Sequence, residues 1–352
     1  MKEVKVLVVG CGHMGSSHAR AYKKIDGFKI VGLVSPVSDC EKLAQELNVS
    51  ETFADYETAL AVAQPDAVSI NTYPDTHAAY AVKALNAGAH VFVEKPIGCT
   101  VSEAEKVVAA AKRNGKKLVV GYILRQHPSW TKFIELARTL GKPLVMRMNL
   151  NQQSRGSEWN THKNLMKALP PIVDCGVHYV DVMCLMTRSR PVRVSAVGAR
   201  LSEEIAPDMY NYGQLQVTFA DGSVGWYEAG WGPMMSENAY FVKDVIGPGG
   251  SVSMVAAKEA ASDNVDAHTR TDRLLVHSGK LDDNMQFAEA DKFIDMADEP
   301  GHQELCDREQ GFFLEAIRKD LDLSEHWEDA INSMKIVLAA DESFRSGKSI
   351  EL

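Results

Sequence analysis

The sequence predicts a doubly wound α/β domain followed by a second α+β domain with an open, predominantly antiparallel sheet. Three observations predict this fold class. The first 120 residues alternate short apolar runs with amphipathic stretches, a glycine-rich loop follows the first run, and strand patterns succeed one another after about residue 122. Alternating strands and helices are typical of a parallel sheet covered on both faces. We expect the domains to span residues 1–122 and 123–352.

Length, charge and hydropathy exclude several classes of protein. At about 100–200 residues per domain, a chain of 352 residues is expected to form two domains. Its 38 Lys and Arg against 47 Asp and Glu leave a net charge of −9, which disfavours binding to nucleic-acid phosphates. No apolar run approaches the roughly 18 residues of a membrane span or the h-region of a signal peptide. We therefore expect a cytoplasmic protein without nucleic-acid or membrane partners.

The cysteines predict neither a disulfide framework nor a metal site. The six stand at positions 11, 40, 99, 175, 184 and 306, and no pair forms Cys-x-x-Cys. This spacing is typical of reduced, mostly buried thiols. No Cys/His cluster has the spacing of a structural zinc site, so we expect no metal.

The elements of the first half follow from their apolar periodicity. Nearly continuous apolar runs such as Val6–Val9 are typical of strands that are buried on both faces. The expected strands are Val4–Val9, Lys29–Val34, Ala67–Asn71, His90–Val93 and Lys117–Val120. The expected helices are Ser16–Lys24, Cys40–Leu47, Tyr56–Ala63, His77–Ala87 and Ser102–Asn114.

In the second half, most strand patterns follow one another without helices between them. This predicts an open sheet with helices on one face. Asp221-Gly222 is a hairpin signal between two strand patterns. We expect helices over Ser129–Thr139, Pro171–Met186 and the periodic C-terminal stretches, and an irregular polar loop over Asn151–Asn164. The expected strands are Pro143–Leu150, Val192–Ala199, Tyr212–Phe219, Ser223–Gly230, Ala239–Ile246 and Gly250–Met254. Trp226 and Trp231 are interpreted as core or interface aromatics of this sheet.

The first strand leads into Gly10-Cys11-Gly12-His13-Met14-Gly15, which opens a helix. This is G-x-G-x-x-G in the strand–turn–helix context that gives the motif its meaning. The first glycine permits the tight turn, the second lets the backbone approach a pyrophosphate, and the third permits close packing. The helix N-terminus adds N–H donors for phosphates. The loop therefore predicts a Rossmann dinucleotide-binding domain.

The choice between NAD and NADP is less clearly encoded. A loop that prefers NAD usually has Asp or Glu about 20 residues further on, where it binds the ribose hydroxyls. Ser35 stands at that place, and the nearest acid, Asp39, is four residues late. Serine is compatible with a 2′-phosphate, although no Arg lies beside it. NADP, or use of both cofactors, is slightly favoured.

Three further segments complete a recognisable pattern. They are Asn71-Thr72-Tyr73-Pro74-Asp75-Thr76-His77 after the third long strand, Glu94-Lys95-Pro96 after the next, and Asp174-x-x-x-His178 in the second half. With the glycine loop and in this order, the whole chain resembles the glucose–fructose oxidoreductase/inositol dehydrogenase (Gfo/Idh/MocA) family. Two departures are Ser35 in place of an acid, and Ala168-Leu169-Pro170-Pro171 in place of a glycine-rich run before Asp174.

The resemblance implies an NAD(P)-dependent dehydrogenase or reductase acting on a CH–OH group of a sugar, an inositol or a derivative. It also implies a homodimer or homotetramer assembled through the open sheet, and a polyhydroxylated small-molecule substrate. We expect the cofactor to contact Gly10, Gly12, His13, Met14, Gly15, Ser35, Asn71, Thr72, Tyr73, His77, Glu94 and Lys95. We expect the substrate to contact Lys95, Tyr122, Arg125, Trp159, His162, Asp174 and His178.

Lys95, Asp174 and His178 are the expected catalytic residues. Histidine titrates near neutrality and suits the base that takes the hydroxyl proton. Asp174 lies one helical turn before His178, on the same helix face, and can fix the imidazole tautomer or contact substrate. Lys95 follows a parallel strand, at the edge where open α/β sheets bind ligands, and can polarise the reacting oxygen.

Plainer interpretations stand beside these roles. A helical Asp/His pair is often only solvated, His77 can belong to a helix cap, and Arg125 can form a salt bridge at the domain junction. Trp159 and His162 can belong to a subunit interface. Two other functions use the same residues: a glycosidase or lyase that oxidises its substrate transiently with bound NAD, and a non-catalytic nucleotide or sugar sensor.

Overall fold

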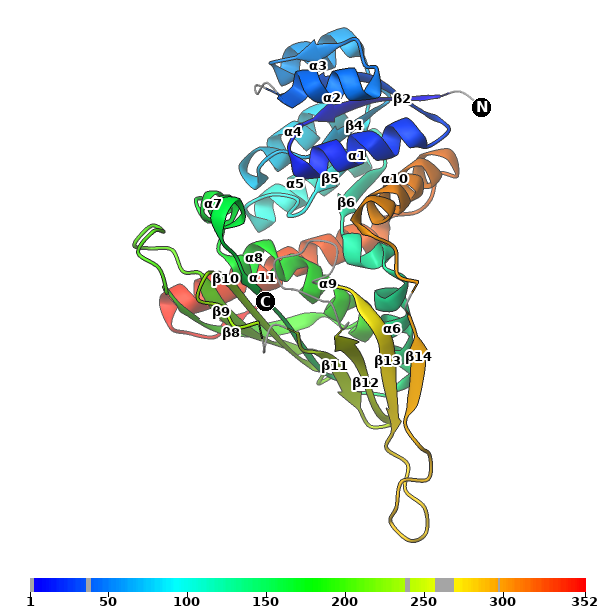
Figure 1. The fold of residues 1–352 in the computed structure, drawn as a ribbon, viewed down its shortest axis with the longest axis vertical. Helices are drawn as coiled ribbons and strands as arrows, with labels where there is room; N and C mark the ends of the chain where they lie inside the picture. Colours follow the sequence, from blue (N-terminus) through cyan, green and yellow to red (C-terminus); the bar gives the residue numbers. More distant parts are fainter. Residues whose placement is uncertain (1–2, 36–38, 238–240, 257–268, 297) are drawn as a thin grey trace. The chain divides into compact units, whose positions relative to one another are not determined.

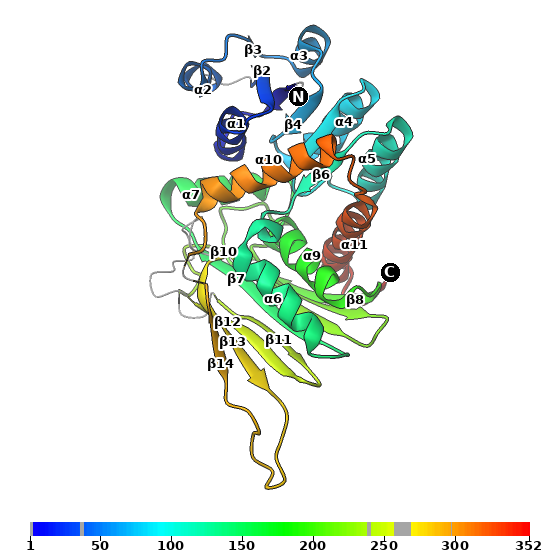
Figure 2. The ribbon, with the colours of Figure 1, turned by 90° about the vertical axis from the view of Figure 1, so that its right-hand side faces the viewer.

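The computed structural model describes residues 3–35, 39–237, 241–256, 269–296 and 298–352. The chain divides into two compact units (Figures 1 and 2). Unit 1 comprises Met1–Ile123 and Gly301–Ile331, and unit 2 comprises Leu124–Pro300 and Asn332–Leu352. A stretch near the C-terminus therefore belongs to the first unit. Our assignment of residues 123–352 as one substrate-binding domain stays a prediction.

Unit 1 is built on a six-stranded parallel sheet of order β3-β2-β1-β4-β5-β6. The strands are β1 (Val4–Val9), β2 (Phe28–Val34), β3 (Thr52–Phe53), β4 (Ala67–Ile70), β5 (His90–Glu94) and β6 (Leu118–Gly121). β1 lies at the centre, where Val8 pairs with Leu33 of β2 and Ser69 of β4. The strand order reverses there, which puts the carboxyl ends of β1 and β4 at the switch point where such sheets bind ligands.

The connecting helices are α1 (His13–Lys24), α2 (Asp39–Leu47), α3 (Tyr56–Ala63), α4 (Pro74–Asn86) and α5 (Val101–Asn114). Local sequence fixes their ends. Thr100 and Glu103 form a capping box at the start of α5, and Gly115 ends that helix in the left-handed region, at φ 61°. Because parallel strands are joined by right-handed crossovers, reversing the strand order puts the helices on both faces of the sheet.

Helix α10 (His302–Arg318) joins unit 1 from the far end of the chain and packs against α1. Its Phe313 is fully buried and lies with its ring centroid 6.2 Å from those of Phe28 and Phe92. The last helix, α11 (Ser324–Ser346), begins in unit 1 and ends in unit 2. In unit 1 its Trp327 indole N–H donates to the carbonyl of Leu118.

Unit 2 is built on a nine-stranded sheet of order β14-β13-β12-β11-β7-β10-β9-β8-β15. Every strand pair is antiparallel except β7 with β10. The strands are β7 (Val145–Gln153), β8 (Pro191–Ala199), β9 (Tyr212–Phe219), β10 (Val224–Gly232), β11 (Lys243–Gly247), β12 (Gly250–Ala256), β13 (Thr271–Ser278), β14 (Lys292–Asp295) and β15 (Ile350–Glu351). In Figure 1, β13 and β14 continue as a long hairpin.

Helices cover one face of this sheet and leave the other open. They are α6 (Pro128–Thr139), α7 (Gly156–Leu165), α8 (Pro171–Asp174) and α9 (Gly176–Thr187), preceded by the 3₁₀ turn Ile123–Gln126. The covered face carries Tyr227, whose ring stacks on Tyr179 of α9 at 4.7 Å. On the open face Val145 pairs with Val224 and Ile246 in neighbouring strands, and each side chain is about 40% exposed.

The fold class predicted from the sequence is confirmed, and three element predictions need correction. The segment 151–164 is not an irregular loop, because β7 runs to Gln153 and α7 begins at Gly156. The helix expected over 171–186 is interrupted at Cys175, where α8 ends and α9 begins. The strand expected over 239–246 begins at Lys243, and residues 239 and 240 lie outside the described residues. Within the described residues, no helix is long and apolar enough to cross a membrane.

Candidate functional site

The glycine loop at the end of β1 leaves space for a ligand only at its second glycine. Gly10 has φ +87°, and a Cβ there would lie 2.6 Å from the carbonyl oxygen of Asn71. A Cβ on Gly15 would lie 1.8 Å from the carbonyl oxygen of Gly10, so α1 packs directly on the loop. A Cβ on Gly12 would meet no atom within 4 Å. The loop therefore has a tight turn, a close packing contact and an open edge, the cradle that a pyrophosphate needs.

Helix α1 starts at this open edge. Gly12 is its N-cap residue, and its first turn contains no acidic residue, so the unpaired N–H groups there are not neutralised by a carboxylate. His13 and Met14 occupy the first turn, and the His13 ring lies 5.4 Å from that of His302 on α10. The helix begins three residues earlier than we predicted, because the motif itself supplies its first turn.

The end of β2 lies beside the loop. The carbonyl of Val34 accepts from the Gly10 backbone N–H at 2.8 Å. Cys11 is buried with its Sγ 3.5 Å from Sγ of Cys40, in the first turn of α2. Burial raises the pKa of both thiols, which keeps them protonated at neutral pH. Ser35 follows β2 directly, and its backbone N–H donates to the Phe53 carbonyl at 3.1 Å. Its role in the choice between NAD and NADP stays a prediction.

The segment after β4 contributes a buried amide and an exposed ring. Asn71 is 8% exposed, and its backbone N–H donates to the Val9 carbonyl at 2.8 Å, which ties this segment to β1. Thr72 Oγ1 lies 2.6 Å from Thr76 Oγ1. Tyr73, the N-cap residue of α4, is 58% exposed. An exposed aromatic ring after β4, the strand that pairs with β1, provides a surface on which a planar base can stack.

His77 connects the segments after β4 and β5. It lies inside α4 and is 1% exposed. Its Nδ1 lies 2.7 Å from the Pro96 carbonyl and its Nε2 lies 2.9 Å from the Thr72 carbonyl. Burial lowers the pKa of His77, although both carbonyls oppose that shift. The ring therefore ties two segments together, and a contact with the cofactor stays a prediction.

Lys95 follows directly on β5, at the same edge of the sheet as the glycine loop. Its backbone N–H donates to Glu94 Oε2 at 3.1 Å. The other oxygen of Glu94 lies 2.8 Å from Nε2 of His18, on α1. Glu94 is 7% exposed and His18 is fully buried. The carboxylate that precedes the predicted catalytic lysine therefore contacts two groups of unit 1, and a cofactor contact by Glu94 stays a prediction.

Sequence reasoning missed His18 and its partners Gln310 and Tyr22. His18 lies three residues after the last glycine of the loop, on the face of α1 that packs on the sheet. Its place after the motif was a signal that the sequence analysis did not use. Gln310 comes from α10, 292 residues along the chain, and nothing in the sequence pairs these two positions.

In unit 2, Asp174 closes α8 and His178 lies in the first turn of α9. Asp174 is 5% exposed, with its Oδ2 3.9 Å from Sγ of Cys175. Cys175 keeps right-handed helical dihedrals, so the two predicted catalytic residues lie one helical turn apart despite the interruption. Pro171 begins the segment at a position that tolerates the missing N–H.

Arg125 forms a salt bridge, as one of our two interpretations predicted, and its partner is Asp181 within unit 2. Its Nε and Nη2 donate to Asp181 Oδ2 and Oδ1 at 2.8 and 2.6 Å. The Asp181 side chain is 1% exposed and that of Arg125 is 19% exposed. Tyr122, in unit 1, is 2% exposed, with its ring 6.0 Å from that of His326. Substrate contacts by Arg125 and Tyr122 stay predictions.

Trp159 and His162 lie on a helix rather than in the polar loop that we expected. The Trp159 indole N–H donates to Glu204 Oε1 at 3.1 Å. The His162 ring stacks on Trp231 at 4.4 Å with 4° between the planes, and its Nδ1 lies 2.9 Å from Ser154 Oγ. Both side chains are less than 10% exposed. They support α7 against the sheet, and a substrate contact stays a prediction for each.

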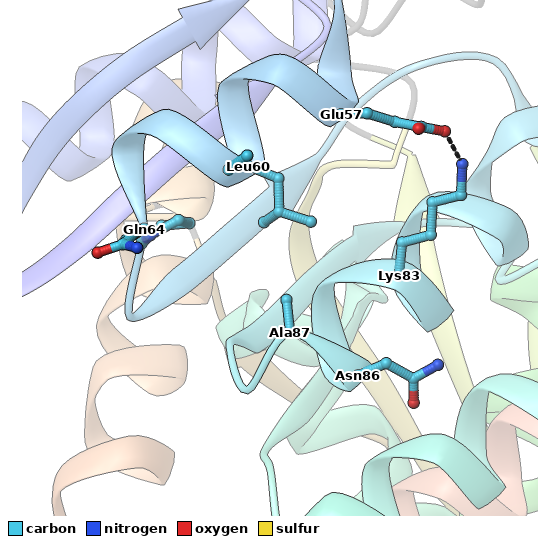
Figure 3. Close-up of a pocket in the computed structure, with 8 residues that line it drawn as sticks. Glu57, Leu60, Gln64, Lys83, Asn86 and Ala87 are labelled. Carbon is cyan, nitrogen blue, oxygen red and sulfur yellow. Dashed lines mark hydrogen bonds and ion pairs between the residues drawn. The ribbon is translucent and has the colours of Figure 1, made fainter.

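Two other features of unit 1 bear on ligand binding. His18, Cys306 and Glu309 offer metal-ligand atoms that all lie within 4.8 Å of one another. Both ring nitrogens of His18, however, already lie within hydrogen-bond distance of protein atoms, Glu94 Oε1 and Gln310 Nε2. A hollow between α3 and α4 is lined by residues that include Leu60, Gln64, Lys83 and Ala87 (Figure 3). Because Gln64 precedes β4 and Ala87 follows α4, this hollow lies at the edge opposite the glycine loop.

Two family models match the chain. Residues 4–122 match the oxidoreductase family with an NAD-binding Rossmann fold (GFO_IDH_MocA). Residues 136–252 match the GFO/IDH/MocA C-terminal domain. The two models match in the order of the two halves predicted from the sequence, and together they cover more than half of the chain.

Curated proteins and solved structures resemble the chain at lower identity. The UDP-N-acetylglucosamine 3-dehydrogenase of Acidithiobacillus ferrooxidans is 30% identical over 56% of this chain and 59% of that protein. The scyllo-inositol 2-dehydrogenase (NAD(+)) of Bacillus subtilis is 25% identical over 99% of this chain and 96% of that protein. The match to the first protein, like those to the Salmonella inositol 2-dehydrogenases, spans little more than half of its length.

A crystal structure of an oxidoreductase from Agrobacterium radiobacter, in complex with NAD+, L-tartaric acid and magnesium, has a TM-score of 0.81. It covers 99% of this chain and 98% of that chain at 16% identity, which establishes the similarity of fold alone. The matching family models, the glycine cradle and the order of the motifs lead to one conclusion. The chain belongs to the Gfo/Idh/MocA family of NAD-binding oxidoreductases.

Proposed function

We propose that this protein is an NAD(P)-dependent dehydrogenase or reductase acting on a secondary alcohol, or the matching ketone, of a sugar, an inositol or a related polyol. The observation that carries the proposal is the position of Lys95 in unit 1. It follows β5 at the sheet edge that also carries the glycine cradle, and the backbone around both is fixed by hydrogen bonds. The similarity to inositol and sugar dehydrogenases supports this class of substrate.

The residues of unit 1 fit a dinucleotide. Gly12 leaves open space at the start of α1, where the N–H groups can bind a pyrophosphate. Tyr73 and the segment 71–73 lie on the nicotinamide side in this proposal, and Ser35 binds the adenosine ribose. Because Ser35 carries no negative charge, a 2′-phosphate is not repelled there, and we propose use of NADP or of both cofactors. When bound, the nicotinamide supplies the hydride acceptor or donor.

The protein residues manage the proton and the charge on the substrate oxygen. In this proposal His178 takes the hydroxyl proton during oxidation, since imidazole changes protonation near neutral pH. Asp174, one turn earlier, orients that ring. Lys95 stabilises the developing alkoxide through its ammonium group. Arg125 holds Asp181 by its bidentate salt bridge and acts as a support for α9.

We also propose that the open face of the unit 2 sheet joins two or more copies of the chain. Val145, Val224 and Ile246 lie side by side across three strands of that face, and a row of partly exposed aliphatic side chains is more favourable when covered. Light scattering on the wild type and on Val145→Lys tests this assembly. A mass unchanged by the substitution, or a monomeric wild type, contradicts it. A cytoplasmic location likewise remains our prediction.

The experiment that tests the function follows nicotinamide absorbance while the purified protein meets inositols, hexoses, glycosides and keto-sugars. Each compound is tried with NAD and NADP, and in reverse with the reduced cofactors. We expect net turnover with at least one polyol, and a loss of about 100-fold or more in Lys95→Met with cofactor affinity unchanged. Wild-type turnover by Lys95→Met would exclude Lys95 from the reaction.

Two other outcomes would replace the proposal. Product formation without net change in free cofactor identifies a lyase or glycosidase that oxidises its substrate transiently. Cofactor binding with no turnover of any compound in the panel favours a sensor. Lys83→Met serves as the matched control, because Lys83 pairs with Glu57 beside the α3–α4 hollow, away from the glycine loop (Figure 3).

A further inference from the structure

Four buried side chains of unit 1 form a continuous hydrogen-bonded chain that ends at the backbone of Lys95. The Tyr22 hydroxyl lies 2.6 Å from Gln310 Oε1, and Gln310 Nε2 lies 2.9 Å from His18 Nδ1. His18 Nε2 lies 2.8 Å from Glu94 Oε1, and Glu94 Oε2 accepts from the Lys95 N–H at 3.1 Å. Tyr22, His18 and Gln310 are fully buried, so no solvent competes for these bonds.

The direction of each bond follows from the chemistry of the end groups. The amide oxygen of Gln310 faces Tyr22 and accepts from its hydroxyl, which stays protonated because burial raises the pKa of Tyr22. The amide nitrogen, which can only donate, then faces His18 Nδ1. Nδ1 must therefore accept, and the single ring proton lies on Nε2, from which it is donated to Glu94. The amide orientation of one glutamine thus decides the tautomer of one histidine.

The groups that surround His18 agree with a charged Glu94. From β5, Glu94 and the ring of Phe92 face His18, the latter at 4.8 Å in an edge-on contact. From α10, Glu309, Cys306 and Gln310 face it. Burial and the nearby charge of Glu94 raise the pKa of Glu309, and burial raises that of the Cys306 thiol. These two groups stay neutral, which leaves Glu94 as the carboxylate that accepts from two donors.

We infer that Gln310 and Tyr22 are positioning residues for Lys95. They fix His18 in its Nε2–H tautomer, and His18 in turn keeps Glu94 ionised and oriented against the backbone of Lys95. The inference rests on the proposed function, in which Lys95 stabilises charge on the substrate oxygen. It assigns a role to α10, a helix from the C-terminal part of the chain, in holding a loop of the nucleotide-binding sheet.

Breaking the hydrogen-bonded series at Gln310 has a specific consequence for Glu94 and for the backbone of Lys95. Without the Gln310 amide, only Glu94 still favours a proton on Nε2, so the fraction of His18 rings with the proton on Nδ1 rises. In those rings the lone pair on Nε2 faces Glu94. A lone pair and a carboxylate repel each other, so Glu94 takes up a proton or turns away. The backbone N–H of Lys95 then loses its acceptor, and the segment that carries the Lys95 side chain is less well fixed.

The first test compares Gln310→Met with Gln303→Met. Gln303 lies on the same helix and donates to α1 through the Ser17 carbonyl, but it is outside the four-residue chain. We expect kcat to fall roughly tenfold to a hundredfold in Gln310→Met, as when a reacting group is misplaced, with the Kd for reduced cofactor changed less than about threefold. Gln303→Met keeps the wild-type rate and cofactor affinity.

A second measurement does not depend on activity. Nitrogen NMR of the ring-labelled protein reports the His18 tautomer, with His18→Asn to assign its resonances. We expect two well-separated ring resonances with the proton on Nε2 in the wild type and in Gln303→Met, and a shifted tautomer balance in Gln310→Met. Two similar resonances, indicating a doubly protonated ring, or a proton on Nδ1 in the wild type, would overturn the inference. So would a stoichiometric metal ion in the purified protein, which needs a His18 nitrogen.

Tyr22→Phe keeps the test valid if Gln310→Met does not fold. It removes one hydroxyl and allows the Gln310 amide to rotate, so we expect a smaller loss of rate, about threefold to tenfold, in the same direction. If Gln310→Met lowers cofactor affinity and kcat equally and leaves the His18 tautomer unchanged, its role is structural. If Lys95→Met is fully active, the proposed function fails while the NMR result for His18 stands by itself.

Discussion

The two units bury polar groups in different ways. In unit 1, Tyr22 donates to Gln310, Gln310 donates to His18, and His18 contacts the carboxylate of Glu94. In unit 2, charged groups are buried beneath and beside α9. Arg125 and Asp181 form a bidentate ion pair, and Lys243 is 1% exposed with its Nζ 3.1 Å from the Asn149 carbonyl. Among the residues described, Lys243 has no ion-pair partner.

This difference predicts how substitutions will affect each unit. A hydrogen-bonded series of mostly neutral groups fixes the orientation of its side chains. Its contribution to the free energy of unfolding changes little with pH. Buried charges cost desolvation free energy and make stability depend on their partners and on pH. Unit 1 is therefore expected to lose function when altered, and unit 2 is expected to lose stability. Five predictions test this contrast, from the largest effect to the smallest.

The largest expected effect is in unit 2. Arg125→Met leaves the buried Asp181 carboxylate without its partner, and we expect the free energy of unfolding to fall by about 3–5 kcal/mol. Chemical denaturation measures it. The control is Arg147→Met, whose ion pair with Asp244 lies on the open face of the sheet, with the Arg147 side chain 49% exposed; it should cost less than about 1 kcal/mol. Equal losses of unfolding free energy in Arg125→Met and Arg147→Met would contradict this prediction.

The next effect is in unit 1 and concerns binding. Gly15→Ala brings a Cβ to 1.8 Å from the Gly10 carbonyl, and backbone on both sides prevents easy relief. We expect the affinity for reduced cofactor to fall by about 100-fold, or about 2.7 kcal/mol, as titration by fluorescence will report. Gly311→Ala in α10 has no atom within 4 Å of its Cβ and should stabilise the protein by up to about 1 kcal/mol. Full affinity in Gly15→Ala would show that the loop relaxes.

The third prediction uses pH. Burial lowers the pKa of Lys243 to about 7, below its value of 10.5 in the unfolded chain. Between those values the unfolded state binds more protons than the folded state, so stability rises with pH. We expect the unfolding free energy of the wild type, relative to Lys243→Met, to rise by about 2–3 kcal/mol from pH 7 to pH 9. A difference that is flat over this range would mean that Lys243 is solvated.

Removal of the Lys243 charge also tests the aromatic cluster around it. The Nζ lies 3.8 Å from the ring centroid of Phe241 and 5.7 Å from that of Tyr179. The hydroxyls of Tyr179 and Tyr227 have no hydrogen-bond partner among the described residues. At pH 6, where the lysine is charged, these rings supply its stabilising contacts. Tyr179→Leu should therefore lower the unfolding free energy more in the wild type than in Lys243→Met.

The smallest effect separates packing from substrate binding in unit 2. His162→Phe keeps the stack on Trp231 and loses the bond to Ser154 Oγ, so we expect a loss of about 1 kcal/mol in stability. If His162 acts only in packing, kcat/KM stays within about twofold of wild type in the polyol assay. A loss of tenfold or more in kcat/KM at unchanged stability would instead support the substrate contact that the sequence predicted.

Much of unit 1 could be predicted because its signals are local. The glycine loop needs φ +87° at Gly10 and no side chain at Gly15, and both requirements can be recognised in the letters of the motif. Strands such as β1 are buried on both faces and therefore form continuous apolar runs. The boundaries of α3, and of α5 to within one residue, followed from the same local patterns.

Unit 2 was harder because its polar segment folds through distant contacts. Residues 151–164 lack apolar periodicity, yet Trp159 and His162 pack on Glu204 and Trp231, which come more than 40 residues later. A helix that is stabilised by such contacts carries no clear 3.6-residue pattern. The salt bridge between Arg125 and Asp181 is equally non-local, since the two residues are 56 positions apart.

The sequence by itself determined the fold class, the nucleotide-binding loop and the family, because each depends on residue types at short spacings. Only the tertiary structure decided what holds the Lys95 loop. The atoms that fix it come from α1, β5 and α10, and Gln310 meets His18 across 292 positions of the chain. A hydrogen bond depends on distances of a few tenths of an ångström between groups that sequence does not place together, so its partners are fixed by packing.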